Sequence, residues 1–91
     1  MALFAGVAGY KIILDVGIDI SLSEIRKVIC RDPSSGKIKE IDADVESPRM
    51  ISFVTQKSTF QASGTWQLQA EVDGKPGEIC TLEFETPLRN K

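Results

Sequence analysis

Apolar and polar side chains alternate along much of this chain, in short runs separated by turn-forming residues. In the first run, from Tyr10 to Val16, every second residue is apolar, so these side chains share one face of an extended strand. Ile13 is the exception, because it is apolar on the face that the alternation assigns to solvent. No run keeps its apolar residues at helical spacing, and the pattern therefore predicts an all-β fold.

The alternation predicts six strands, at 10–16, 25–31, 37–46, 50–55, 65–73 and 78–86. A short helical turn within 18–24 is an alternative to a loop there. The side chains expected to face inward are Tyr10, Ile12, Leu14, Val16, Val28, Cys30, Ile41, Ala43, Val45, Ile51, Phe53, Trp66, Leu68, Ala70, Val72, Cys80, Leu82 and Phe84. Short strands at even spacing favour a two-sheet sandwich over a closed barrel.

Turn signals divide these strands and set the expected domain limits. The clearest turn is at 32–36, where proline and glycine lie close together, and a hairpin connection is expected at 73–77. We expect one sandwich domain at 10–87, preceded by an apolar arm at 1–9 and followed by a tail at 88–91.

Composition narrows the functional classes. The chain has 91 residues, 42% of them hydrophobic and 26% charged, which is typical of a globular domain and not of a disordered or collagen-like chain. Its 11 basic and 13 acidic residues give a net charge of −2, and the basic residues are scattered, so we expect no nucleic-acid binding. It contains no histidine, which removes the usual proton shuttle and imidazole ligand. We therefore expect no enzymatic activity, no metal and no cofactor.

The apolar N-terminus has its first positive charge at Lys11, whereas a secretory signal begins with basic residues, so we do not expect a signal peptide. No apolar run reaches the ~18–20 residues that a membrane span requires, and membrane insertion is not expected.

The two cysteines, Cys30 and Cys80, are too few for a structural zinc site. An immunoglobulin disulfide would place a tryptophan soon after the first cysteine, yet Trp66 lies nearer the second. We expect two buried, reduced thiols; the rival interpretation is a reactive thiol, although no histidine is present to activate one.

Two further clusters have a functional and a plain structural interpretation. Asp42, Asp44 and Glu46 alternate along one predicted strand, as a calcium or acid/base site could, but solvent exposure of that face explains the alternation fully and is the favoured interpretation. Trp66, together with Phe53, Phe60 and Tyr10, could form an aromatic platform for a sugar. The alternation instead places Trp66 in the core.

Apolar residues on faces expected to meet solvent are the most informative deviation. They make up the candidate interface, which consists of Leu3, Phe4, Val7, Ile13, Ile29 and Ile79. If contiguous, they indicate a surface for a partner protein; if scattered or covered by the arm, they indicate nothing.

Three segments carry a resemblance to a known family: 14–21 (LDVGIDIS), 28–33 (VICRDP) with Gly36, and 60–70 (FQASGTWQLQA) with Val72 and Gly74. They resemble a family of bacteriophage tail and baseplate domains, similar to the N-terminal domain of siphophage upper baseplate proteins. The resemblance implies an immunoglobulin-like β-sandwich of six to seven antiparallel strands, without catalytic residues. It also implies a location in the virion, with assembly in the host cytoplasm, docking to other tail or baseplate proteins, and scope for homo-oligomers.

The run Gly64-Thr-Trp66-Gln-Leu68 is similar to the G-x-Y-x-C run of immunoglobulin strand F, with tryptophan in the tyrosine position and leucine in the cysteine position. Leu68 would then explain the missing disulfide. The first expectation for function is thus a virion structural module. A carbohydrate-binding or adhesin-like sandwich is the second, and a thiol-dependent enzyme is a distant third.

Overall fold

The computed structural model describes residues 3–88, which form eight β-strands and no helix. The strands are β1 (Leu3–Phe4), β2 (Lys11–Asp15), β3 (Arg26–Arg31), β4 (Ile38–Asp42), β5 (Asp44–Ser47), β6 (Met50–Val54), β7 (Gly64–Val72) and β8 (Lys75–Glu85). The predicted all-β class is confirmed. Within the described residues there is no helix long and apolar enough to cross a membrane.

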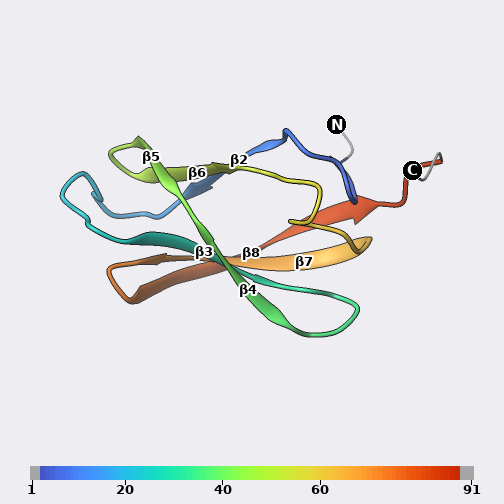
Figure 1. Cartoon of the computed structure of the whole chain (residues 1–91). Helices are drawn as coiled ribbons and strands as arrows, with labels where there is room; N and C mark the ends of the chain where they lie inside the picture. The colour runs from blue at the N-terminus through green and yellow to red at the C-terminus, as the bar shows by residue number, and fades with distance from the viewer. Residues whose placement is uncertain (1–2, 89–91) are drawn as a thin grey trace.

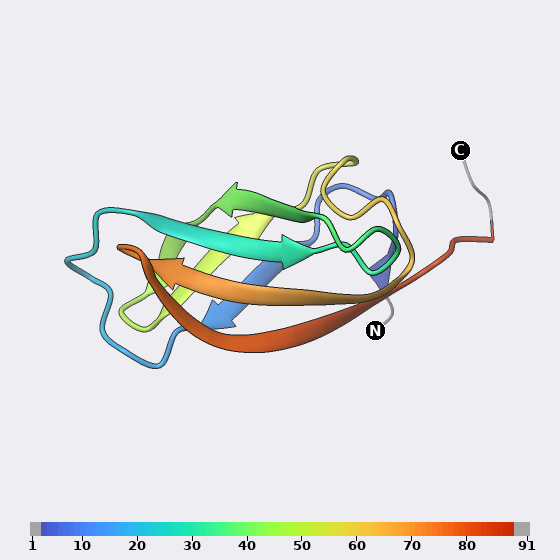
Figure 2. The same cartoon turned by 90° about the horizontal axis from the view of Figure 1, so that it is seen from below.

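The strands form two sheets that face each other across a shared core (Figures 1 and 2). The larger sheet has the strand order β1-β8-β7-β3-β4, and the smaller has the order β2-β6-β5. Apart from the parallel pair β1–β8, all neighbouring strands are antiparallel. This two-layer arrangement agrees with the sandwich predicted from the alternation.

The core lies between the sheets and contains most of the side chains predicted to face inward. Trp66, Leu68, Ala70 and Val72 of β7 are all buried, as are Val28 and Cys30 of β3. The smaller sheet contributes Ile12, Leu14, Ile51 and Phe53. Phe60, from the loop before β7, joins them; its ring stacks on Phe84 with 4.4 Å between centroids.

The predicted strand at 37–46 is wrong, because the chain changes sheets in its middle. β4 pairs with β3 in the larger sheet, whereas β5 pairs with β6 in the smaller one. Ala43 joins them; it is buried, and its N–H donates to the carbonyl of Arg26 at 3.1 Å. Beyond this crossover Val45 is exposed rather than inward-facing, because β5 is positioned by its pairing with β6 and not by β3.

The N-terminal segment is also more integrated than expected. Leu3 and Phe4 form β1, which pairs with the end of β8, and Leu3 packs against the core. The Gly6 N–H donates to the carbonyl of Phe60 at 2.8 Å. With the extra strand and the crossover, the strand count is eight rather than six to seven. Residues 1, 2 and 89–91 of the predicted arm and tail lie outside the described part of the chain.

Of two connections, one has its expected form and one differs from it. Residues 18–24 form a loop with turns, as expected, and not the helical alternative; the Ile20 N–H donates to the Pro48 carbonyl at 2.7 Å. The β7–β8 hairpin turns in two residues, Asp73 and Gly74, whose φ values are +50° and +81°. Positive φ at both positions is the signature of the tight type I′ hairpin, so β8 begins at Lys75, earlier than predicted.

Candidate functional site

The outer face of the larger sheet carries a shallow apolar hollow. Strand register aligns Ile29 of β3, Gln69 of β7 and Ile79 of β8 in one row across the sheet. Ile38 of β4 lies opposite Arg31 in the next row. Together with neighbouring residues these side chains enclose about 220 Å³; the lining residues are Ile29, Arg31, Ile38, Gln67, Leu68, Gln69 and Ile79.

A second hollow lies along the side of the molecule where β2 and β8 are the facing strands. It encloses about 350 Å³ and is lined by Ile13, Leu14, Asp15, Ala70, Glu78, Ile79, Cys80, Thr81 and Leu82. Ile79 borders both hollows and is 62% exposed. The outer face and the open side therefore form one continuous surface around this residue.

The structure brings together only half of the candidate interface. Ile29 and Ile79 both line the first hollow, and Ile13 and Ile79 both line the second. Leu3 is half-buried against the core, whereas Phe4 and Val7 are exposed but border neither hollow. The arm thus does not cover the exposed isoleucines.

Ile38 was missed by sequence reasoning. It is 57% exposed and lies just after the 32–36 turn, where alternation in the predicted 37–46 strand puts it with the acidic residues. An isoleucine on a face otherwise occupied by acidic residues is the feature of the sequence that could have identified Ile38. Three further apolar residues, Ile18, Leu22 and Ile25, are exposed in the loop between β2 and β3 and were also missed.

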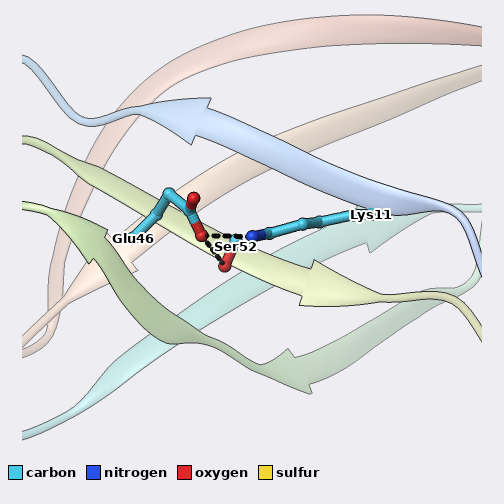
Figure 3. A network of polar contacts seen from close by, with 3 residues as sticks. All are labelled: Lys11, Glu46 and Ser52. Atoms are coloured by element: carbon cyan, nitrogen blue, oxygen red, sulfur yellow. Dashed lines mark hydrogen bonds and ion pairs between the residues drawn. The ribbon is translucent and has the colours of Figure 1, made fainter.

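The smaller sheet carries a polar network on its outer face instead (Figure 3). Lys11 of β2 contacts Glu46 of β5 at 2.8 Å, and the Ser52 hydroxyl of β6 donates to the same carboxylate oxygen at 3.0 Å. These bonds, from Lys11 first and then Ser52, lower the pKa of Glu46. One carboxylate thereby links all three strands of this sheet.

The acidic cluster predicted from the alternation is not one site. Asp42 belongs to β4 and Asp44 and Glu46 to β5, so the carboxylates are divided between two sheets. Glu46 is engaged by Lys11 and Ser52. Over residues 3–88 no group of three or more Asp, Glu, Cys or His side chains could hold a metal ion.

The two thiols are free and flank Leu68 in the same row of the larger sheet. Two strand spacings, ~9.5 Å, separate Cys30 from Cys80, which exceeds the reach of a disulfide. Burial raises the pKa of the Cys30 thiol to about 12 and also raises that of Cys80. Because the thiolate is the reactive form, this environment suppresses nucleophilic chemistry at both positions.

Three of the four aromatic residues considered as a sugar platform lie inside, and the fourth, Tyr10, is half-buried against the core, where its hydroxyl accepts from the Phe4 N–H at 3.2 Å. Trp66 is 1% exposed, and Phe53 and Phe60 are buried as well. Phe60 meets the Trp66 ring edge-on, with 4.9 Å between centroids and an interplanar angle of 83°. The predicted core position of Trp66 is confirmed, and these rings offer no face to a sugar.

In comparisons with known proteins, no protein-family model matches this chain and no curated protein matches it. Its own residues and geometry, above all the exposed isoleucines around Ile79, therefore carry the functional inference.

Proposed function

We propose that this chain is a non-enzymatic structural protein of a phage or prophage virion, an immunoglobulin-like tail or baseplate accessory module that acts by docking to other proteins. The observation that carries the proposal is the meeting of Ile29, Ile38 and Ile79 on the outer face of the larger sheet. Ile29 and Ile38 belong to the adjacent strands β3 and β4, whereas Ile79 comes from β8. A hollow that brings exposed apolar residues of several strands together is typical of a protein-binding surface.

The strand order supports the immunoglobulin-like assignment. The order β2-β6-β5 corresponds to strands B-E-D of that fold, and β3-β7-β8 to strands C-F-G. Trp66 adds a specific feature, since it lies two residues before Leu68 and donates its indole N–H to the Ala62 carbonyl at 2.9 Å. Immunoglobulin domains use a tyrosine at this corner in the same way.

The virion assignment draws on the resemblance of the segment 60–70 to phage tail and baseplate domains. The structure gives residues of this segment clear packing roles: Gly64 lies against Pro33, Trp66 fills the core, and Leu68 is completely buried. Such roles fit a scaffold that presents surfaces, and the raised pKa values of both thiols fit it too.

Carbohydrate binding has weaker support, because Trp66, Phe53 and Phe60 are enclosed in the core. No observation on the described residues favours it. A glycan array with tryptophan fluorescence provides a direct check: under the docking proposal, no glycan shifts the emission of the buried indole.

Sedimentation of particles tests the proposed function. We expect the tagged chain, produced during phage growth, to co-sediment with virions on a density gradient. Replacing Ile38 with Asp is expected to release it, because a charge in the apolar hollow opposes docking. Leu22→Asp is the matched control, since Leu22 is 95% exposed and lies in another loop. A wild-type chain that stays at the top of the gradient contradicts the proposal.

A further inference from the structure

The side of the molecule between β2 and β8 is open. β8 runs for 11 residues, but β1 pairs only with its end, at Phe84 and Glu85. β2 is likewise an edge strand of the smaller sheet. Figure 2 shows β8 along the margin of the larger sheet. β7 pairs with Ile79 and Thr81 on one side, and on the other side the described residues place no strand beside them.

On the side away from β7, the backbone of β8 has N–H and C=O groups that can form hydrogen bonds with another strand. The Ala5 N–H donates to the Glu85 carbonyl at 2.9 Å, so Glu85 directs its main-chain groups away from β7. Because these directions alternate along a strand, Ile79 and Thr81 also direct their N–H and C=O groups outward. Unpaired groups of this kind form a template for another strand. β1 already uses the same template further along.

Apolar side chains form the floor beside this edge. Leu14 and Ala70 are buried there, Cys80 and Leu82 are half-buried, and all four line the 350 Å³ hollow. A strand added to β8 directs every second side chain toward this floor. The groove therefore suits an extended segment whose apolar residues alternate, which is the arrangement of β-augmentation.

The charged residues around the groove between β2 and β8 determine which kind of strand it favours. Glu78 of β8 and Asp15 of β2 lie together around one end, where they line a further hollow of about 300 Å³, and Glu83 lies beyond Thr81. The basic side chains around the groove are engaged or lie to one side of it. Lys11 is paired with Glu46, and the Arg49 guanidinium donates to the Gly17 carbonyl at 2.9 Å. Arg31 lies on the outer face of the larger sheet, across Gln67 from Thr81, and Lys75 lies at the start of β8, on the far side of Pro76. A second copy of β8 would bring its own Glu78 and Glu83 to this acidic rim, whereas a basic strand complements it.

We propose that the groove between β2 and β8 binds an extended, basic β-strand of a partner protein, which adds to β8 beside Ile79 and Thr81. The bound strand continues the line of β1 along the same edge, its alternate apolar residues cover Leu14 and Leu82, and its Lys or Arg side chains face Glu78 and Asp15. This inference deepens the proposed docking function and rests on it, since it identifies the chemistry of the partner.

Titration with two model strands tests the charge preference. The basic peptide KVKVTVK and the acidic peptide EVEVTVE, both capped at their ends, have the same apolar pattern and differ only at the charged positions. In amide NMR spectra of the full chain we expect saturable shifts at Ile79 and Thr81 with the basic peptide and an affinity ~10-fold lower or worse with the acidic one. Equal affinities, shifts confined to other surfaces, or no saturable shift with either peptide would overturn the proposal. So would an edge occupied by a second copy, detected as self-association by sedimentation equilibrium.

Substitutions at Thr81 test the mode of binding. Thr81→Pro removes an N–H that points away from β7, so it blocks strand addition without removing a bond to β7. Thr81→Val keeps this N–H and is the matched control. We expect the proline variant to bind KVKVTVK at least ~10-fold more weakly and the valine variant to bind it as wild type. Equal binding by both variants contradicts strand addition.

Thr81→Lys keeps the N–H and adds a repulsive charge, which provides a second test if the proline variant does not fold. It should weaken binding of the basic peptide and not that of the acidic one, and the opposite result contradicts the proposal. Particle sedimentation distinguishes failure of the strand-addition site from failure of the docking function. If wild type and Thr81→Lys both co-sediment with virions, the docking function stands and the strand-addition site is wrong; if wild type itself does not, the docking function is wrong.

Discussion

The indole N–H of Trp66 donates to the main-chain carbonyl of Ala62, 2.9 Å away, while the rest of the side chain is enclosed in the core. This hydrogen bond ties the loop before β7 to the beginning of that strand. It also satisfies the only polar atom of the indole, which would otherwise be buried without a partner. Trp66 thus joins the loop that carries Phe60 to the larger sheet.

Substitution of Trp66 should be among the most destabilising changes in the chain. Trp66→Ala is expected to lower the free energy of unfolding by ~3–5 kcal/mol, because it leaves a large cavity. Trp66→Phe keeps an aromatic ring but leaves the Ala62 carbonyl without its donor, which adds ~1–3 kcal/mol to a smaller packing loss. Urea unfolding measures both. Leu22→Ala is the control, expected within ~0.5 kcal/mol of wild type; a Trp66→Ala variant as stable as this control refutes the core assignment.

Gly64 is required for two reasons, its backbone conformation and its contact with Pro33. Its φ is +119°, and a Cβ there would lie 3.2 Å from Cγ and 3.3 Å from Cβ of Pro33. Gly36 also has a positive φ, +72°, but a Cβ there would meet open space. We expect Gly36→Ala to cost ~1–2 kcal/mol from backbone strain alone and Gly64→Ala to cost more. Thermal unfolding of the two variants gives the comparison, and equal losses would contradict both the greater backbone strain at Gly64 and the contact with Pro33.

The Asp73 carboxylate stabilises the β7–β8 turn in a pH-dependent way. It accepts hydrogen bonds from the N–H groups of Ile25, at 2.8 Å, and Glu24, at 3.0 Å, and these bonds lower its pKa. Its stabilising contribution is therefore full above the ordinary carboxyl pKa and is lost as the pH falls through the lowered value. Asp73→Asn tolerates the positive φ and removes only the charge.

We expect Asp73→Asn to be less stable than wild type at neutral pH, with the difference shrinking as the solution is acidified. Urea midpoints measured for both proteins across the acidic range provide the check. Asp15→Asn controls for loss of a carboxylate elsewhere on the surface. A difference between wild type and Asp73→Asn that is constant with pH would contradict this role of the turn carboxylate.

The thiols are expected to be inert at neutral pH. Iodoacetamide followed by mass spectrometry should label Cys80 slowly and Cys30 more slowly still, because Cys30 is completely buried and Cys80 only half-buried. Denaturant should accelerate both reactions. Because burial raises the pKa of Cys30 to about 12, any labelling of the native protein at this position should increase far into the alkaline range. Rapid labelling of Cys30 at neutral pH would restore the reactive-thiol interpretation.

Alternation of side chains was enough to predict the inward faces of β2, β3, β7 and β8, because each of these strands has one face on the core. It did not predict the crossover at Ala43. Asp42 and Asp44 are exposed on both sides of it, so the pattern continues unbroken while the chain changes sheets. Nor did it predict β1, since two residues, Leu3 and Phe4, are too few to show a period.

The candidate site was only partly predictable for a related reason. Ile13, Ile29 and Ile79 were identified one by one as exceptions to the alternation. Whether such residues meet depends on register, which aligns Ile29 with Ile79 across Gln69, and on the packing that brings Ile13 of the other sheet beside Ile79. The open edge of β8 is a property of strand order and has no signature in the sequence of β8 itself.

Amide hydrogen exchange in the assembled particle tests most directly whether the open edge of β8 is the docking site. The exchange rates of Ile79 and Thr81 are compared, by mass spectrometry of the overlapping peptides, between the isolated chain and the chain in purified virions, with the loop around Leu22 as internal reference. We predict rapid exchange at both residues in the isolated chain and strong protection in the particle, with the reference unchanged. Equally rapid exchange of Ile79 and Thr81 in the two states would contradict the account.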